Sequence, residues 1–355
     1  MSAGYGWVTP EADLEPTALP GARGPWTEWL FAQLARSPQP VSVPLLPVAD
    51  PLSDDDAALA LYVLYELHYR GFEGVDEEWE WAPTLLGARR ALEAQMLQGL
   101  RAEAGVDEPP GDVARALVQM VEGGGGRSLS RFLADTGTPE QMREFAVHRS
   151  AYQLKEADPH TWALPRLVGR VKAAMVEIQA DEYGAGIERD MHQNLFALTM
   201  HALGLDTRYG AYLDLLPGTT LAPVNIISFF GLHRRWRGAL VGHLALFEMT
   251  SVEPMGRYSQ ALRRMGYGPA ARHFFEVHVV ADAHHEHVAA VDLAGGMATQ
   301  DPRLSADILF GARCAGLVEG RFTDAVLDAW QRGTSSLRRP LAFPQKSPAS
   351  AAASA

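Results

Sequence analysis

The sequence predicts an all-α protein, and three observations support this fold class. No segment shows the period-two alternation of β-branched residues that marks a half-buried strand. Apolar residues instead recur at helical spacing through most of the chain after residue 53. At 355 residues and 47% hydrophobic composition, the chain can bury a large core. We therefore expect packed helices forming one large domain or two ordinary ones.

Composition excludes several classes of function. The net charge of −12 disfavours nucleic acid and anionic membranes as partners, because both require clustered positive charge. Cys314 is the only cysteine, so internal disulfides, multi-thiolate zinc sites and Cys-ligated iron–sulfur clusters are excluded. Residues 1–20 lack the basic and apolar parts of a signal peptide, and no 18-residue uncharged apolar run occurs. We expect a cytoplasmic protein without a membrane span.

Residues 1–125 are predicted to form an irregular segment followed by a helical extension. Residues 1–52 are rich in Pro and Gly, whereas residues 53–56 (Ser-Asp-Asp-Asp) are a strong helix start. Helices are expected over residues 26–35, 57–70, 83–104 and 110–122. Glu66 and His68 are two positions apart and therefore lie on different helix faces, so they are not expected to share a metal. We expect this extension to cover a bundle or to form a homodimer contact.

Four consecutive glycines at residues 123–126 predict a loop, because ordering glycine costs more conformational entropy than ordering other residues. We place a domain boundary there and expect a helical domain over residues 128–338. Residues 344–355 are mostly Ser, Ala and Pro and are expected to be disordered. Helices of the second domain are expected over residues 128–135, 139–155, 164–183, 189–203, 210–215, 221–231, 235–248, 255–265, 270–294 and 304–335.

One predicted helix carries a candidate metal site. His278, Asp282 and His285 stand at relative positions 0, 4 and 7, so their side chains form one stripe over two turns. Imidazole and carboxylate in this ratio suit Fe(II), Mn(II) or Zn(II), with further ligands from neighbouring helices. The alternative is a solvated polar helix end, because His284 and His287 crowd the same turn. The apolar residues that interleave with the stripe favour an inward orientation.

Other candidate ligands carry weaker signals. Glu248 lies in an apolar helix, where an acid is costly unless it is paired or metal-bound; it could equally cap the helix or pair with Arg257. His192 heads a helix, and a lone His is more often a satisfied polar residue. Glu182 belongs to an acidic helix end, where a bound cation would offset the unfavourable helix dipole. Glu156 has no distinguishing feature on chemistry alone.

Four motifs together resemble the heme-oxygenase-like diiron oxidases and oxygenases, bacterial iron-containing redox enzymes related in fold to heme oxygenase and to TenA-like proteins. The resemblance covers about residues 130–335 and implies a heme-oxygenase-like (TenA-like) helical bundle. Its most specific motif is the stripe on the late helix. The motifs are Gln153-Leu154-Lys155-Glu156-Ala157-Asp158-Pro159-His160, Val176-Glu177-Ile178-Gln179-Ala180-Asp181-Glu182-Tyr183-Gly184, Met191-His192 and His278-x3-Asp282-x2-His285.

The resemblance also implies a ligand set for two iron ions, with manganese as the alternative metal. One ion would be held by Glu156, His192 and His285. The other would be held by His278 and Asp282, with Glu182 and Glu248 as further carboxylates. Where some family members have an acid three residues before the His192 position, this chain has Arg189. Either Glu182 or Glu188 is then expected to replace that acid.

The function implied by the resemblance is a non-heme diiron oxidase or oxygenase that activates O2. Its substrate would be a small organic molecule, changed by N-oxygenation, hydroxylation or oxidative C–C cleavage. No flavin, ferredoxin or nicotinamide motif is present, so an external electron donor or the substrate itself would supply electrons. The alternatives are a heme-binding oxygenase, a TenA-like hydrolase and a metal-free binding or scaffold protein. The hydrolase is disfavoured because Cys314 lies outside every candidate motif.

Overall fold

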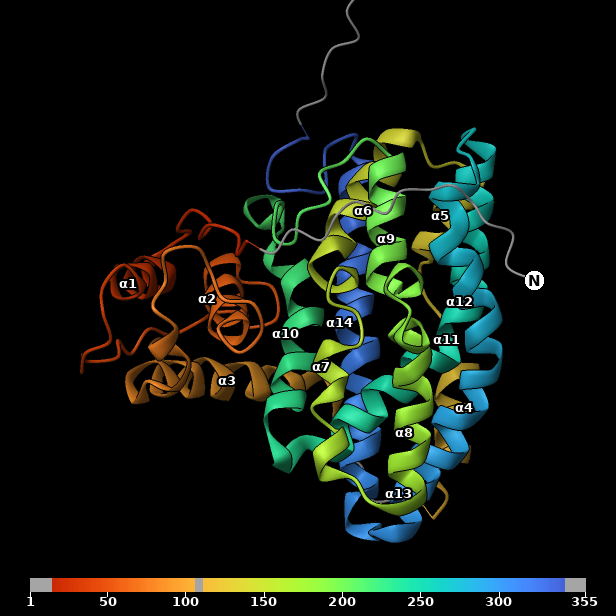
Figure 1. Ribbon diagram of the computed structural model, residues 1–355, viewed down its shortest axis with the longest axis horizontal. Coiled ribbons are helices and arrows are strands. Elements are labelled where there is room, and N and C mark those ends of the chain that lie inside the picture. Colours follow the sequence, from red (N-terminus) through yellow and green to blue (C-terminus); the bar gives the residue numbers. More distant parts are fainter. Residues whose placement is uncertain (1–14, 106–110, 342–355) are drawn as a thin grey trace, which may run out of the picture.

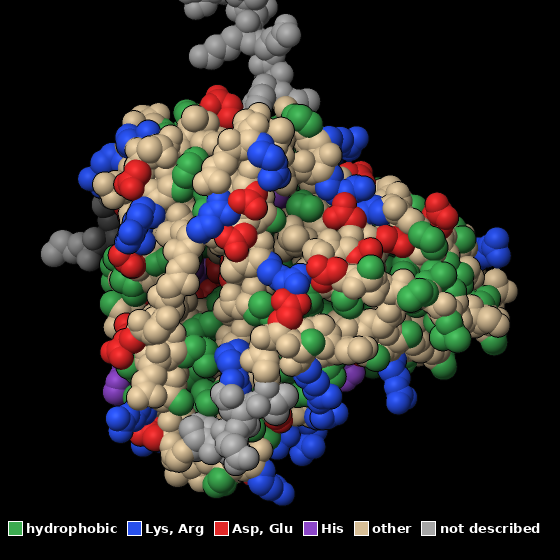
Figure 2. Space-filling model, turned by 180° about the vertical axis from the view of Figure 1, so that it is seen from behind, with side chains coloured by type: hydrophobic (Ala, Val, Ile, Leu, Met, Phe, Trp, Pro, Cys, Tyr) green, Lys and Arg blue, Asp and Glu red, His purple; other side chains and the backbone are tan. Residues whose placement is uncertain are grey.

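The computed structural model describes residues 15–105 and 111–341. Within these ranges the regular structure is helical and contains no strand, which confirms the predicted all-α class. No helix in the described ranges is both long and apolar enough to cross a membrane. The predicted disordered tail at 344–355 lies outside the described residues. On the face shown in Figure 2, basic and acidic side chains are interspersed.

The long helices after residue 128 run side by side as a bundle (Figure 1). The central helix α11 packs along both α12 and α14. Where α11 crosses α14, Gly311 allows close approach, because a Cβ atom there would lie 1.9 Å from the carbonyl oxygen of Ala239. The bundle comprises α5 (Leu129–Asp135), α6 (Pro139–Gln153), α8 (Gly169–Glu182), α9 (His192–Ala202), α10 (Gly218–Leu232), α11 (Arg237–Arg264), α12 (Pro269–His287) and α14 (Ser305–Gln331), with short α7 (Asp158–Thr161) and α13 (Gly296–Gln300).

The N-terminal helices project from one side of the bundle beside α10 (Figure 1). They are α1 (Pro25–Leu34), α2 (Asp55–Glu66) and α3 (Pro83–Ala104), while α4 (Val113–Glu122) packs on the bundle itself. Asp54 caps α2 by accepting a hydrogen bond from the backbone N–H of Ala57, as the acidic helix start predicts. One apolar core joins α2 to α10 without interruption. The two-domain division stays a prediction.

Several segments differ from the sequence prediction; the predicted helix 210–215, for example, is only a short 3-10 turn at Leu213–Leu215. Residues 235–248 and 255–265, predicted as two helices, form the single helix α11, which continues through Pro254 and packs along α12 and α14. The predicted helix 270–294 divides into α12 and a π-helical segment, η7 (Val288–Gly295). The short helix α7 was not predicted, since four residues carry no periodic signal.

Candidate metal centre

The seven predicted ligands come together inside the bundle from five elements. All seven residues are buried, none being more than 8% exposed. His284 and His287 of the same helix are exposed, so the structure excludes the alternative of a solvated helix end for the stripe. The seven are Glu156 in the turn after α6, Glu182 at the end of α8, His192 at the start of α9, Glu248 in α11, and His278, Asp282 and His285 in α12.

Their donor atoms form two overlapping groups. The first group contains Glu156, Glu182, His192 and His278, and the second contains Glu182, Glu248 and His285. Within each group the candidate ligand atoms lie within 4.8 Å of one another. Ligands on opposite sides of one ion would be about 4.4 Å apart at ordinary metal–ligand bond lengths. Both groups are therefore compact enough to hold a metal ion, and Glu182 is placed to bridge them.

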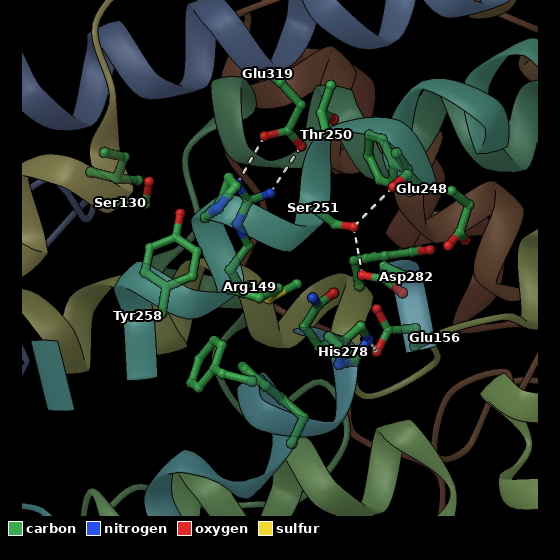
Figure 3. Close-up of a pocket in the computed structure, with 18 of the residues that line it drawn as sticks. Ser130, Arg149, Glu156, Glu248, Thr250, Ser251, Tyr258, His278, Asp282 and Glu319 are labelled. Carbon is green, nitrogen blue, oxygen red and sulfur yellow. Dashed lines mark hydrogen bonds and ion pairs between the residues drawn. The ribbon is translucent and has the colours of Figure 1, made fainter. Parts of the chain in front are cut away.

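The imidazole nitrogens and carboxylate oxygens of the cluster lie close to one another, at 3.0 to 3.8 Å. Nδ1 of His192 lies 3.0 Å from Oε2 of Glu182, and Nε2 of His278 lies 3.7 Å from Oε2 of Glu156. Nδ1 of His285 lies 3.4 Å from Oε2 of Glu248 and 3.8 Å from Oδ1 of Asp282. Asp282 therefore stands beside the second group (Figure 3).

The cluster fits divalent cations because most of its donor atoms have no other partner. Buried polar atoms in proteins are nearly always hydrogen-bonded, so several orphans at one place require an explanation. Four carboxylates and neutral imidazoles would also carry a charge of −4, which two divalent ions would balance. The buried atoms without a hydrogen-bond partner are Oε2 of Glu156, Oε2 of Glu182, Nδ1 of His192, Nε2 of His278, Oδ1 of Asp282 and Nδ1 of His285.

Comparison with known proteins agrees with this chemistry. The family described as iron-containing redox enzyme matches residues 143–320, half of the chain and all seven cluster residues. The chain belongs to this family. It has the heme-oxygenase-like helical fold, and the resemblance inferred from the motifs is confirmed.

This member of the iron-containing redox enzyme family is also similar to a bacterial synthase. It is 25% identical to nitrosourea synthase of Streptomyces achromogenes subsp. streptozoticus over 136 residues. The alignment covers 38% of this chain and 29% of the relative, so the chain matches less than a third of that protein's length.

The predicted assignment of ligands to the two ions differs from the grouping of donor atoms in the structure. His285 was assigned with Glu156 and His192, but the structure places His278 in that group and His285 with Glu248. The physical reason is the separation of the two histidines by seven residues, or about 10 Å along the helix axis. The His192 ring lies 4.2 Å from the His278 ring, centroid to centroid, at one end of the cluster.

Of the two acids expected to replace the missing ligand at Arg189, Glu182 is the one that lies in the cluster. Arg189 is exposed and lies 3.5 Å from the carboxylate of Asp190. Glu188, the other candidate, is also exposed. Glu182, as the last residue of α8, turns inward and reaches both ligand groups.

Neighbouring groups orient the ligands of α12. Nδ1–H of His278 donates to the carbonyl oxygen of Phe274 at 2.8 Å, which leaves Nε2 available to a metal. Nε2–H of His285 donates to Asp181 at 3.0 Å and leaves Nδ1 available. The hydroxyl of Ser251 donates to Oδ2 of Asp282. The sequence offered no signal for Ser251, because it contacts Asp282 only through the packing of α11 on α12.

The cluster shifts the pKa values of its members in opposite directions. Burial, then repulsion from Glu182, raises the pKa of Glu156 well above its usual range. Burial, then Glu248, raises the pKa of Asp282 to about 8. Although burial disfavours the charged form of Glu182, nearby His192 lowers the pKa of that carboxyl to about 2. Without a cation, the cluster therefore retains protons on some carboxyls, and a metal ion would displace them.

A cavity of about 340 Å³ opens beside the cluster (Figure 3). Glu156, Glu248, His278 and Asp282 line its inner part. Its apolar wall consists of Phe145, Phe196, Leu244, Phe247, Met255 and Phe275.

The cavity has further polar contacts that sequence reasoning missed. Arg149 donates two hydrogen bonds to Glu319, at 2.9 and 2.8 Å, away from the ligand cluster (Figure 3). Gln153 and Gln179 each stand three residues before a cluster glutamate, and each has one buried amide atom without a partner. The Gln-x-x-Glu spacing was visible in the sequence, but only the structure brings the two amides to one cavity.

Proposed function

We propose that this enzyme is a non-heme diiron oxidase or oxygenase that uses O2 to oxidise a small organic molecule held in the cavity. The observation that carries the proposal is a set of six buried, unpartnered donor atoms, five of which belong to two ligand groups that share Glu182, while the sixth, Oδ1 of Asp282, lies beside the second group. A single ion would leave part of this set unsatisfied. Two ions would use both groups and balance the four carboxylate charges.

The ligand chemistry favours iron, with manganese as the alternative ion. Carboxylates and imidazoles suit both metals, and no thiolate is present in the cluster to favour softer ions. Two ferrous ions, when bound, would supply two electrons for the reduction of O2. The carboxylates would stabilise the resulting ferric charge, and Asp181 and Phe274 would keep the imidazoles oriented during that change.

The cavity supports a small substrate beside the ligand cluster. Its aromatic wall would exclude water from the reacting centre, and the free amide atoms of Gln153 and Gln179 would hydrogen-bond a polar part of the substrate. Insertion of one oxygen atom, with release of the other as water, consumes two electrons beyond those of the substrate. An external donor would therefore restore the reduced centre between turnovers.

Three reactions fit this site: N-oxygenation, hydroxylation and oxidative C–C cleavage. The partial similarity to a nitrosourea synthase favours N-oxygenation, because a nitrosourea contains an oxidised nitrogen. A heme-binding oxygenase is disfavoured, since one axial His would suffice for heme and the buried carboxylates would remain unexplained.

Anaerobic titration with Fe(II), followed by metal analysis, tests the proposal. We expect two iron ions per chain and a change in the visible spectrum when O2 is added. Glu182→Ala should lose most of the iron because this residue belongs to both groups, whereas His284→Ala, at an exposed His of α12, should retain it. Uptake of less than one iron per chain would contradict the proposal, and a Soret shift on heme titration would support the heme rival.

A further inference from the structure

The turn that carries Glu156 is held from the opposite side by the N-terminal extension. Lys155 directly precedes Glu156, yet its side chain points toward α2, where Nζ lies 3.0 Å from Oε2 of Glu66. Both side chains are 1% exposed. The carboxylate of Glu66 also accepts a hydrogen bond from the hydroxyl of Tyr209 at 2.7 Å. The pair therefore has a specific geometry that includes further hydrogen bonding.

Aromatic rings and a second cation complete this contact. Nζ of Lys155 lies 4.4 Å from the ring centroid of Tyr69 and 4.8 Å from that of Tyr62. The backbone N–H of Arg70 donates to Glu66, and its guanidinium donates to the carbonyl oxygen of Leu154, at 3.3 Å each. The two residues that precede Glu156 are thus both held by groups from residues 62–70.

The far side of the same turn is also constrained. Ala157, directly after Glu156, is buried and has φ 75°, a conformation that costs a non-glycine residue free energy unless its surroundings enforce it. Asp158 then accepts a hydrogen bond at 2.9 Å from the hydroxyl of Tyr183, the residue after Glu182. A continuous chain of contacts therefore runs from Glu66 through the Glu156 turn to the end of α8.

We propose that Glu66 and Arg70 are positioning residues for the metal centre, acting through Leu154 and Lys155 to aim Glu156 at the cluster. This inference depends on the proposed diiron function. Glu66 and Arg70 lie outside residues 143–320, the part of the chain that matches the family. The N-terminal extension thus contributes to the metal site itself, in addition to covering the bundle.

The double variant Glu66→Gln/Lys155→Met tests this role, because it removes both charges and leaves no unpaired buried charge. Its melting temperature should stay near that of the wild type, since buried ion pairs contribute little net stability when both partners are replaced. Fe(II) affinity at one of the two sites, measured anaerobically against a competing chelator, should fall about tenfold or more, the usual effect of losing an orienting contact. The visible absorption of Co(II) bound in place of iron should change for that site.

A milder variant and a control make the test decisive. Tyr209→Phe removes one hydrogen bond to Glu66 without changing any charge, and should weaken the same site in the same direction. The control is Asp50→Asn/Arg321→Met, which removes the ion pairs of Arg321 in α14 with Asp50 and Glu103 of the N-terminal extension and should leave iron affinity unchanged.

The outcomes separate this inference from the proposed function. If the wild type binds two irons and both the double variant and Tyr209→Phe bind them with wild-type affinity and an unchanged Co(II) spectrum, the positioning role is wrong and the diiron proposal stands. If the double variant does not fold, Tyr209→Phe alone decides in the same way. If the wild type binds less than one iron, both proposals fail.

Discussion

Two buried charged clusters lie on opposite sides of the Glu156 turn. They differ in how many of their polar atoms have a hydrogen-bond or ion-pair partner within the protein. In the Lys155 and Glu66 pair, the ammonium and carboxylate meet at 3.0 Å and neighbouring hydroxyl, backbone and aromatic groups complete the contact. In the ligand cluster, six donor atoms remain without hydrogen-bond partners. The difference shows that burial of charge alone does not mark a functional site. Incomplete pairing marks it, because an external cation can then complete the cluster.

The largest effect should come from breaking the satisfied pair. Lys155→Met leaves the Glu66 carboxylate buried without its cation, which should lower the free energy of unfolding by about 3–5 kcal/mol. Urea denaturation measures this change. Recovery of most of the loss in Glu66→Gln/Lys155→Met would confirm that the unpaired charge causes it. A single variant as stable as the wild type would mean that the two clusters do not differ as described.

The next largest effect should be the stabilisation of the protein when Fe(II) binds the ligand cluster. Fe(II) that binds only the folded protein should stabilise it by about 2.7 kcal/mol at a free concentration 100-fold above the dissociation constant. Differential scanning calorimetry under anaerobic conditions, with and without a chelator, measures the shift. His278→Ala should abolish most of it, because the donor Nε2 is lost from the first group. An equal shift in this variant would show that iron stabilises the protein from another site.

Removing a carboxylate from the ligand cluster should stabilise the metal-free protein, whereas removing Lys155 should destabilise it. In the metal-free protein, Glu248→Gln reduces repulsion among buried acids and should raise the free energy of unfolding by about 1 kcal/mol, the ordinary size of a single-substitution effect. The same variant should bind iron more weakly. Chemical denaturation and metal analysis of the same preparation check both results, and a destabilised metal-free variant would contradict the argument.

The smallest effect is a pH dependence confined to the metal-free protein. Burial and Glu248 raise the pKa of Asp282 from 3.8 to about 8, and the stability associated with its retained proton declines as pH rises between those values. For His285, burial opposes the charged form, but the Glu248 carboxylate 3.4 Å from its Nδ1 raises the pKa from 6.5 to about 9. Its stabilising contribution is complete below pH 6.5 and is lost as pH rises through 9.

Melting temperatures of the metal-free protein should therefore fall from pH 6 to pH 9. Iron affinity should rise over the same interval, because the metal displaces these protons. Asp282→Asn should flatten the melting profile, since it removes one of the two titrating groups. An unchanged slope in that variant would assign the pH dependence to other residues.

Local pattern was enough to predict much of this protein. The helical spacing of apolar residues predicted the all-α class, and the acidic start before Ala57 and the prolines at positions 83 and 139 marked helix starts correctly. The stripe of His278, Asp282 and His285 was predicted to face inward, and all three are buried. These features depend on residues within two turns of one another, so the sequence contains them directly.

Contacts between distant segments were decided only by tertiary packing. Chemistry alone gave Glu156 no distinguishing feature, and the family resemblance grouped His278 and His285 differently from the donor-atom groups of the structure. The pairing of Lys155 with Glu66, 89 positions apart, and of Arg149 with Glu319, 170 apart, had no signal in the chain. The physical reason is that periodicity fixes which face of a helix is apolar, whereas the face it meets depends on how all the helices pack together.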